Sequence, residues 1–368
     1  MSILRLAVAW ASVAAFLFFG GPLMAMLGSG LPALLIFIWL LAVVLWASFG
    51  VVHEAEELAE QLGEPYGTLI LTLAIVIIEV ALVGAVMLGA KGAPTLGRDT
   101  MFAVLMIVLN GVVGIGLLVG GLRHFSQGYN LKGASAYLGV IIPLTVIPLF
   151  LPNFTTSTTD GTLTPFQAIA FSVFTVALYG SFLALQTGRH KMFFQEPGED
   201  GAIAAASPPA QAAEHAKGQG LLGRVGLLLA NILPIVILSK SLAVVLDHGI
   251  AQLGAPPALG GILIAMVVLT PEGIAALRAI TANQLQRAIN LCLGAAASTL
   301  GMTVPVVLLI GVFTGQPVVL GLSPTNMAIA AMTLLLSTLT FTGTRTTMLE
   351  GAVHLAVFFV FLVLVFSP

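Results

Sequence analysis

Long runs of apolar residues, separated by short connectors, fill this sequence from one end to the other. A helix needs about 20 consecutive apolar residues to cross a bilayer. Eleven runs meet this requirement, at residues 3–26, 31–52, 68–90, 100–121, 134–151, 165–186, 222–246, 257–277, 286–313, 318–341 and 349–367. Only 8% of the residues are charged, against roughly 25% in soluble domains. We therefore expect an all-α polytopic membrane protein with about eleven transmembrane helices.

Charge and cysteine content exclude several functions. The net charge of −2 argues against nucleic acid as a partner. The one cysteine, Cys292, lies in an apolar run, so we expect a buried side chain and neither a disulfide nor a thiolate metal cluster. The chain has no phosphate-binding loop and no soluble domain for a nucleotide, which excludes a primary pump. No cofactor is expected, and the partners are membrane lipid and the transported ions.

The placement of Lys and Arg predicts the orientation, because cytoplasmic loops carry the excess of these residues. With the N-terminus inside, ten basic residues lie at inside ends or loops: Arg5, Arg123, Lys132, Arg189, Lys191, Lys217, Arg224, Arg278, Arg287 and Arg345. Only Lys91 and Arg98 lie outside. We expect a bacterial inner membrane protein with a cytoplasmic N-terminus and an outside C-terminus.

The long connector divides the spans into two sets of five. Residues 1–28 form an extra N-terminal helix that lacks a convincing signal-peptide cleavage site. Residues 29–187 and 222–368 then hold five spans each, joined by a flexible cytoplasmic loop at 188–221. Because five is odd, the second set crosses the membrane in the opposite sense. This pattern is typical of transporters built from two inverted five-helix repeats.

Each repeat carries one glutamate in its second span, Glu79 in the first and Glu272 in the second. Thr270 and Pro271 precede the second glutamate and Gly273 follows it. Proline removes a backbone donor, so we expect this helix to be interrupted where it lines a cavity. A carboxylate at membrane depth is costly unless it is protonated, paired or bound to a cation. The repeat-matched glutamates are therefore the candidate ion site, with structural, protonated residues as the alternative.

Two carboxylates that meet near the midplane cannot both stay charged without a cation or protons. One Ca²⁺ or two protons balance the same charge, which is the chemistry of a proton-driven exchanger. Ca²⁺ also takes six to eight oxygen ligands, and Asn110, Ser298 and the backbone at Thr270 are candidates to supply some of them, or to support a proton site. Helix–helix hydrogen bonding is the alternative for these polar residues. Na⁺ or K⁺ exchange stays open.

Several short motifs resemble the bacterial calcium:proton antiporters of the ChaA type, in the cation/calcium exchanger superfamily. They are Gly-Glu-Pro-Tyr-Gly at 63–67, Ile-Glu-Val-Ala-Leu at 78–82, Ala-Pro-Thr-Leu-Gly-Arg-Asp-Thr at 93–100, Leu-Thr-Pro-Glu-Gly at 269–273, Asn-Gln-Leu-Gln-Arg-Ala-Ile-Asn-Leu at 283–291 and Thr-Val-Pro-Val-Val at 303–307. The resemblance covers nearly the whole chain and implies an eleven-span fold, with Ca²⁺ and often Na⁺ or K⁺ exported for protons at Glu79 and Glu272. Related exchangers usually carry Gly-Asn-Ala before the first glutamate, whereas this chain has apolar residues at 75–78.

Other charged residues allow functional interpretations beside structural ones. His53, Glu54 and Glu57 follow the second run and predict either a solvated amphipathic turn or an acidic vestibule with a pH-sensitive histidine. Glu350 and His354 are four residues apart and suggest a local pair or a proton relay.

Lys240 lies within a span. Its long side chain can reach the outer surface, or it can serve as a buried counter-charge that replaces a cation.

A secondary antiporter is therefore the predicted function. A cation channel with the same glutamates is a rival, and proton-dependent flux would separate the two. An intramembrane enzyme is not supported, because the spans contain no paired aspartates, no His-Glu-x-x-His motif and no serine–base pair.

Overall fold

A computed structural model describes residues 2–28, 30–62, 66–89, 94–196, 220–343 and 345–367. The α-helices are α1 (Ser2–Ala25), α2 (Gly30–Leu62), α3 (Tyr66–Gly89), α4 (Leu96–Met106), α5 (Val113–His124), α6 (Leu131–Leu149), α7 (Pro165–Thr187), α8 (Leu221–Leu253), α9 (Ala258–Thr281), α10 (Leu285–Ser298), α11 (Val304–Thr314), α12 (Pro324–Thr340) and α13 (Met348–Phe366). Short 3₁₀ turns are η1 (Met26–Gly28), η3 (Leu151–Asn153) and η4 (Lys191–Phe194), and π-helical segments are η2 (Ile107–Val112) and η5 (Thr299–Thr303).

The membrane-crossing helices agree with the expected spans. In the described part of the chain, nine helical stretches are long and apolar enough to cross a bilayer. The α4–η2–α5 stretch and the α10–η5–α11 stretch each count as one of them. α3 adds a shorter apolar stretch, Leu73–Leu88, and α12 has 17 residues. The expected all-α fold is confirmed, since the described strands are only β1 (Gln127–Gly128) and β2 (Arg345–Thr346), which pair antiparallel.

Some helix ends differ from the expected spans. α2 extends to Leu62, beyond the apolar run, because the Ala, Glu, Leu and Gln residues that follow Val52 are strong helix formers. α12 begins only at Pro324, where the Ser323 hydroxyl accepts a hydrogen bond from the Asn326 N–H. Hydropathy therefore located the spans, while capping and helix propensity decided where they end.

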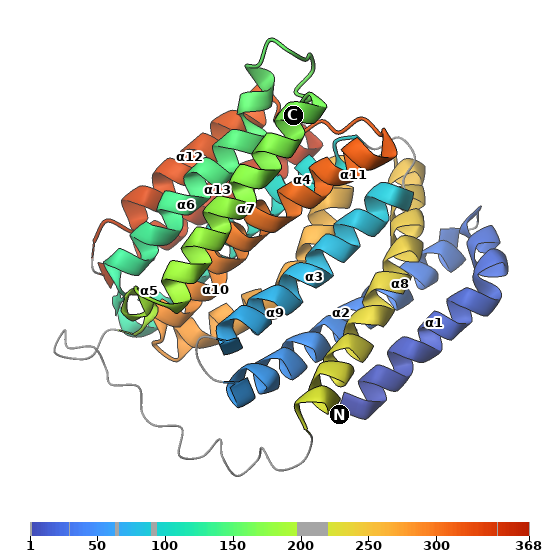
Figure 1. Ribbon diagram of the computed structural model, residues 1–368, viewed down its shortest axis with the longest axis horizontal. Helices are drawn as coiled ribbons and strands as arrows, with labels where there is room; N and C mark the ends of the chain where they lie inside the picture. The colour runs from blue at the N-terminus through green and yellow to red at the C-terminus, as the bar shows by residue number, and fades with distance from the viewer. Residues whose placement is uncertain are drawn as a thin grey trace. The chain divides into compact units, whose positions relative to one another are not determined.

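The chain folds into two compact units, and each unit takes residues from both halves of the sequence. The first unit comprises Met1–Leu96 and Pro208–Pro271. Its helices α1, α2, α3 and α8 lie side by side (Figure 1), with α2 packed on α8, α3 and α1, and α8 packed on α3 and α1. The first part of α9 also belongs to this unit.

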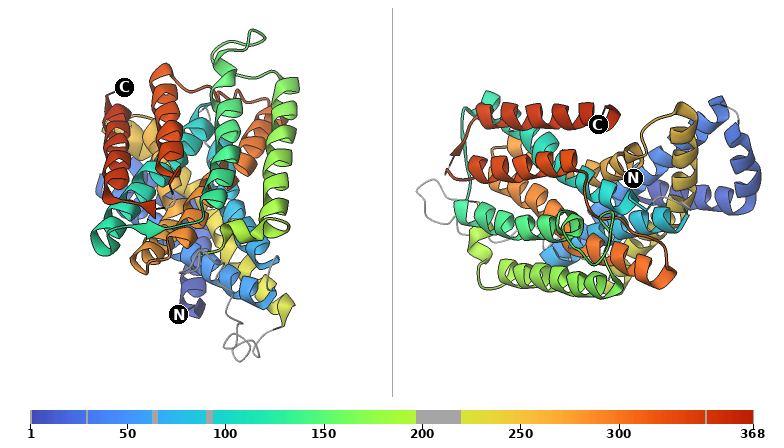
Figure 2. Two further views of the ribbon diagram at one scale, coloured as in Figure 1. Left: turned by 90° about the vertical axis from the view of Figure 1, so that its left-hand side faces the viewer. Right: turned by 90° about the horizontal axis from the view of Figure 1, so that it is seen from above.

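The second unit comprises Gly97–Ser207 and Glu272–Pro368. Its neighbouring helices are α13 and α5, α7 and α11, α6 and α10, and α12 with both α13 and α6. α12 and α13, in red, lie side by side in both views of Figure 2. The last part of α9, from Glu272 onward, belongs to this unit.

Close approach of α5 and α13 depends on two glycines. A Cβ atom at Gly351 of α13 would collide with the backbone nitrogen of Leu118 and lie 2.8 Å from the carbonyl oxygen of Gly114. A Cβ at Gly114 would in turn lie 3.2 Å from the Gly351 carbonyl oxygen. Small residues allow such backbone contact between membrane helices, so this pair sets the spacing of α5 and α13.

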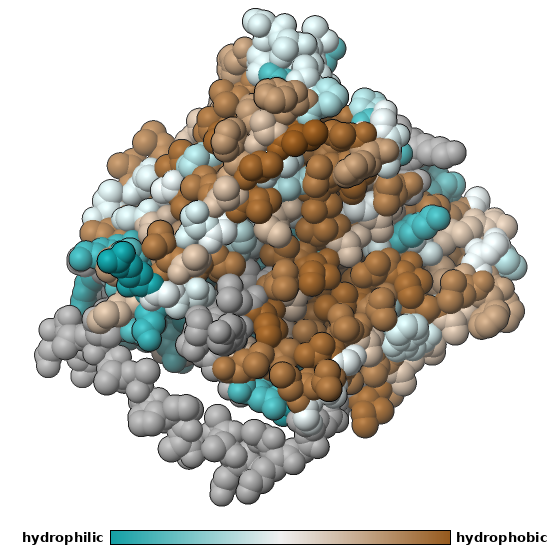
Figure 3. All heavy atoms as spheres, viewed as in Figure 1, coloured by the Kyte–Doolittle hydropathy of each residue, from teal (hydrophilic) through white to brown (hydrophobic). Residues whose placement is uncertain are grey.

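Apolar side chains cover the outer surfaces of the helices. Large hydrophobic residues are exposed along α1, α7 and α13, including Phe18, Phe174 and Phe359. Hydrophobic residues, in brown, also spread over most of the face in Figure 3. Exposure of this kind would be unfavourable in water and is expected for side chains that face lipid tails.

Candidate functional site

Glu79 is a buried carboxylate in the first unit. It is the only charged residue of α3, and 2% of its surface is exposed. α3 packs against α2 and α8, whose neighbouring faces are mainly apolar. Burial of an ionised carboxylate in such surroundings costs several kcal/mol or more. A carboxylate at this position is therefore stable only when it is protonated, paired with a partner or bound to a cation.

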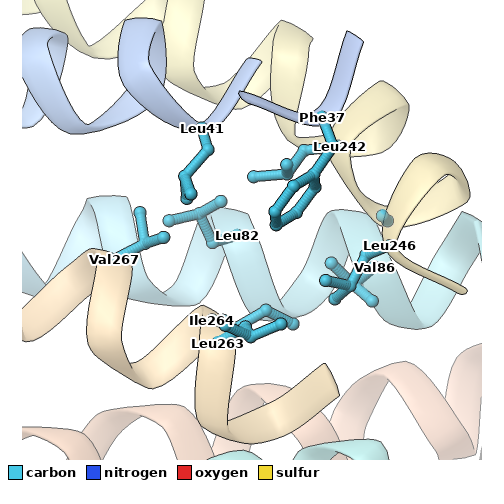
Figure 4. A pocket seen from close by; sticks show the side chains of 10 residues that line it. Phe37, Leu41, Leu82, Val86, Leu242, Leu246, Leu263, Ile264 and Val267 are labelled. Carbon is cyan, nitrogen blue, oxygen red and sulfur yellow. The ribbon is translucent and has the colours of Figure 1, made fainter. Parts of the chain in front are cut away.

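A small recess lies one helical turn from Glu79, between α2, α3, α8 and the first part of α9 (Figure 4). Leu82 of α3 lines it together with Phe37, Leu41, Val86, Leu242, Ala243, Leu246, Leu263, Ile264 and Val267. All of these side chains are apolar, so the recess offers no oxygen to replace the water around a cation. It is a packing gap of the first unit and not an ion site.

Glu272 begins the part of α9 that belongs to the second unit, and its side chain is partly exposed. A Cβ atom at the following residue, Gly273, would lie 3.4 Å from Cγ2 of Val112, so this part of α9 lies against η2. The thiol of Cys292 on α10 is buried and lies within electrostatic range of Glu272. The second glutamate thus lies near η2 and α10.

The expected interruption of the helix at Pro271 is wrong. α9 runs unbroken from Ala258 to Thr281, with Pro271 inside it. The Thr270 hydroxyl donates to the carbonyl of Met266 at 2.6 Å, one turn earlier. Neighbouring helices and local hydroxyl groups let membrane helices accommodate a proline in this way.

The departures from α-helical geometry occur instead in the next span of each repeat. η2 interrupts the α4–α5 span and contains Asn110 and Gly111, while η5 interrupts the α10–α11 span directly after Ser298. π-Helical segments inside α-helices are rare and are found frequently at functional sites. Their presence in matched spans is a structural sign of the repeat, and it marks both spans as candidates for function.

Asn110 belongs to a buried polar cluster of the second unit. Its side-chain nitrogen donates to Thr333 Oγ1 of α12 at 2.8 Å, and its side-chain oxygen lies 3.0 Å from Nδ1 of His354 on α13. The other ring nitrogen of His354 lies 3.0 Å from Thr340 Oγ1. Asn110, His354 and Thr333 have no exposed surface, and Thr340 is also buried. Asn110 therefore links η2 to α12 and α13.

The hydroxyl of Ser298 donates to the carbonyl of Ala295 at 3.0 Å, within its own helix. Ser298 is buried, and Gly301 in the following π-helical segment allows close contact with the ring of Tyr179 on α7. A Cβ atom at Gly301 would lie only 2.6 Å from that ring. These contacts pack η5 tightly against α7.

The acidic segment after the second run lies in the last turns of α2, and basic residues from other helices reach it. Arg224 of α8 donates to Glu57 Oε2 at 2.9 Å, and His53 Nε2 lies 3.3 Å from Glu57 Oε1. Glu54 is buried at 5% exposure, and Arg5 of α1 contributes positive charge nearby. The structure thus joins these acids to Arg224 and Arg5, two bases that lie far away in the sequence.

The remaining candidates are separated from one another. Glu350 closes a capping box at the start of α13, where its carboxylate accepts a hydrogen bond from the Thr347 N–H at 2.9 Å. His354 is bound instead to Asn110 and Thr340, so the expected local Glu350–His354 pair is replaced by two separate sets of contacts. Lys240 is exposed on α8, which contradicts a buried counter-charge.

The polar face of α12 was not recognised from the sequence. Thr333, Ser337 and Thr340 lie on one face of α12 and are all buried. Their spacing of four and three residues in an apolar run is a readable signal for a polar helix face.

Glu196 was missed as well. It accepts hydrogen bonds from the backbone N–H groups of Gln286 and Arg287 at the start of α10. Burial raises the pKa of the Glu196 carboxyl, and these two hydrogen bonds oppose the rise. Glu196 therefore caps the helix that leads into η5.

Comparisons with known proteins agree with this architecture. Residues 32–188 and 224–367 match the family described as sodium/calcium exchanger protein. The y4hA protein of Sinorhizobium fredii is 43% identical over 323 residues, which cover 88% of this chain and 86% of that protein. The sodium-potassium/proton antiporter ChaA of Escherichia coli is 37% identical over 330 residues, which cover 88% of this chain and 87% of ChaA.

Among solved structures, native YfkE has the same fold, with a TM-score of 0.69 at 16% sequence identity over the full length of both chains. The matched ranges and the identity over most of both chains leave one assignment: this chain is an integral membrane protein that belongs to the sodium/calcium exchanger family.

Proposed function

We propose that this protein is a secondary antiporter that exchanges a cytoplasmic cation for external protons by alternating access. The observation that carries the proposal is that both repeats of this exchanger-family chain have the same features in the same spans. Each repeat holds one glutamate in its second span, Glu79 or Glu272, and a π-helical interruption in its third. Carboxylates within membrane spans mark ion and proton pathways.

The two glutamates perform the exchange by binding either a proton or a cation. Protonation of a carboxylate oxygen removes the negative charge that attracts the cation, while a bound cation stabilises the ionised form and lowers its proton affinity. The low dielectric around Glu79 strengthens both effects, because the charged form is poorly solvated there. Proton and cation occupancy are then mutually exclusive, which is the requirement for antiport.

Ca²⁺ is one candidate cargo, since its charge balances two carboxylates. Na⁺ or K⁺ is the second candidate, and two observations favour it. Residues 75–78, just before Glu79, are apolar and supply no amide ligand. The Asn110 side-chain oxygen is engaged by His354, which reduces the neutral oxygens available for the six or more ligands that Ca²⁺ takes.

The excess of Lys and Arg supports an orientation with the N-terminus and the loop after α7 in the cytoplasm of a bacterial cell. In this orientation α3 runs outward and α9 runs inward. The exchanger would then use an inward proton gradient to export cations across the inner membrane.

Everted membrane vesicles that hold an imposed pH gradient test the proposal. CaCl₂, NaCl and KCl are added separately, and dissipation of the gradient is followed with a pH-sensitive dye. An antiporter dissipates the gradient only when its cargo is added, and the cation that acts at the lowest concentration is the preferred one. Cation flux that requires no proton movement would establish the channel instead.

Glu79→Gln and Glu272→Gln should each abolish exchange, because an amide neither titrates nor neutralises a cation. Asp160→Asn is the matched control, since Asp160 is an exposed carboxylate in the loop between α6 and α7. Its exchange should equal that of the wild type. Exchange that persists in either glutamine variant would remove that glutamate from the site.

A further inference from the structure

His354 is held on both sides of its ring in the interior of the second unit. It has no exposed surface, and its ring nitrogens lie 3.0 Å from Asn110 Oδ1 and 3.0 Å from Thr340 Oγ1. These partners come from η2 and α12, while the histidine itself lies in α13. One side chain therefore joins three helical elements.

The hydrogen bonds of Asn110 define the tautomer of the ring. The Asn110 amide nitrogen donates to Thr333 Oγ1 at 2.8 Å and approaches Met106 Sδ at 3.6 Å, so the amide oxygen is the group that faces the ring. That oxygen can only accept, and Nδ1 must carry the proton. Nε2 is then the acceptor for the Thr340 hydroxyl. A neutral histidine satisfies both neighbours at once.

Among the described residues, no acidic side chain forms an ion pair with the His354 ring. α13 itself contributes Glu350, whose carboxylate is engaged in the capping box with Thr347. α5 contributes Arg123 and His124 in its last turn, and neither η2 nor α12 has a titratable side chain. The groups that contact the ring are the Asn110 amide, the Thr340 hydroxyl and the backbone of Leu109, and none of them titrates.

The opposite side of η2 meets the part of α9 that carries the second glutamate. A Cβ at Gly273, next to Glu272, would lie 3.4 Å from Val112 of η2. Further along, Gly116 and Gly120 of α5 make room for the side chain of Ile280 on α9. Contacts thus run from α13 through Asn110 and η2 to the helix turn of Glu272.

We propose that His354 is a positioning residue for the exchange: its neutral ring holds Asn110, and through Asn110 the π-helical segment η2 that packs beside Glu272. The proposal rests on the exchange function proposed above. It gives α13, which carries neither of the two glutamates, a role in the transport reaction. It also explains why a fully buried histidine has non-titrating partners on both nitrogens.

The test compares His354→Leu with His354→Asn in the vesicle assay. Leucine removes both hydrogen bonds and leaves the Asn110 oxygen without its donor. Asparagine places an N–H near the position of Nδ1, where it can donate to Asn110, but it cannot titrate. We expect the leucine variant to need about tenfold more cation for half-maximal exchange, in line with the loss of a buried hydrogen bond. The asparagine variant should stay within about threefold of the wild type and keep its pH profile.

Two further variants complete the design. Thr333→Val releases Asn110 from the opposite side and should raise the half-maximal cation concentration as His354→Leu does, which keeps the test valid if the leucine variant fails to fold. Ser337→Ala is the matched control, because Ser337 lies on the same buried face of α12 and its hydroxyl has no hydrogen-bond partner among the described residues. It should behave as the wild type.

Failure of His354→Asn to the same degree as His354→Leu, with an altered pH profile, would show that the histidine carries protons and would overturn the proposal. Wild-type exchange in both His354→Leu and Thr333→Val would overturn it as well. An inactive wild type is a different outcome, because it contradicts the exchange function itself. Glu272→Gln, assayed in the same vesicles, provides the inactive reference.

Discussion

The contact between α5 and α13 makes a sharp prediction for Gly351→Ala. The new Cβ atom would collide with the Leu118 nitrogen and lie 2.8 Å from the Gly114 oxygen and 2.9 Å from the Leu117 carbonyl carbon. All three are backbone atoms, so no rotamer change can relieve the overlap and α13 must move away from α5. Overpacking of this kind costs up to about 3 kcal/mol, while alanine in place of glycine in a helix returns about 1 kcal/mol. The net destabilisation should be about 2 kcal/mol.

Unfolding of purified protein in detergent micelles measures this effect. Gly180→Ala on α7 is the matched control, because a Cβ at Gly180 meets nothing within 4 Å. This variant should keep only the gain in helix propensity and unfold at the same temperature as the wild type or slightly higher. Gly351→Ala should unfold several degrees lower, since 1 kcal/mol corresponds to roughly 2–4 °C in larger domains. Equal shifts in the two variants would refute the close-contact argument.

The remaining predictions concern charged groups near the helix ends. Arg224→Gln and Glu57→Gln should show a coupling of about 0.5–1 kcal/mol in a double-mutant cycle of unfolding, because Arg224 is mostly buried while Glu57 is half exposed; strictly additive effects would mean that the pair contributes nothing. For Glu196, burial raises the carboxyl pKa, so its contribution to stability is present at low pH and is lost as pH rises through that pKa. Glu196→Gln should therefore unfold at a higher temperature than the wild type at pH 8 and at the same temperature at pH 4, and the opposite ranking at pH 8 would show that the hydrogen bonds from Gln286 and Arg287 outweigh burial.

Hydropathy alone located the spans, because each crossing must bury its backbone polar groups in a helix and cover it with apolar side chains. The spans α3 and α9 could be recognised on this basis, and the single glutamate inside each of them stood out as an exception. The helix ends were less predictable. Residues 53–62 are polar yet helical, since propensity continues a helix after hydropathy has ended.

The partners of several side chains could not be predicted, because they come from segments that are far apart in the sequence. Arg224 pairs with Glu57, although the two are 167 residues apart. His354 was expected to pair with Glu350 or to relay protons, but its partner Asn110 lies 244 residues away. Pro271 was expected to break α9, but α9 is continuous. The helices depart from α-helical geometry at η2 and η5 instead, and neither segment contains a proline. A change from i−4 to i−5 hydrogen bonding has no local sequence signature, because it depends on what the neighbouring helices leave room for.

The two π-helical segments lie at nearly the same place in the two halves of the chain. Each is a short widened stretch inside an otherwise α-helical span. Ile107 follows Glu79, and Thr299 follows Glu272, at separations that differ by a single residue. The α-helical hydrogen-bond pattern is therefore lost in both halves at nearly the same distance beyond the glutamate.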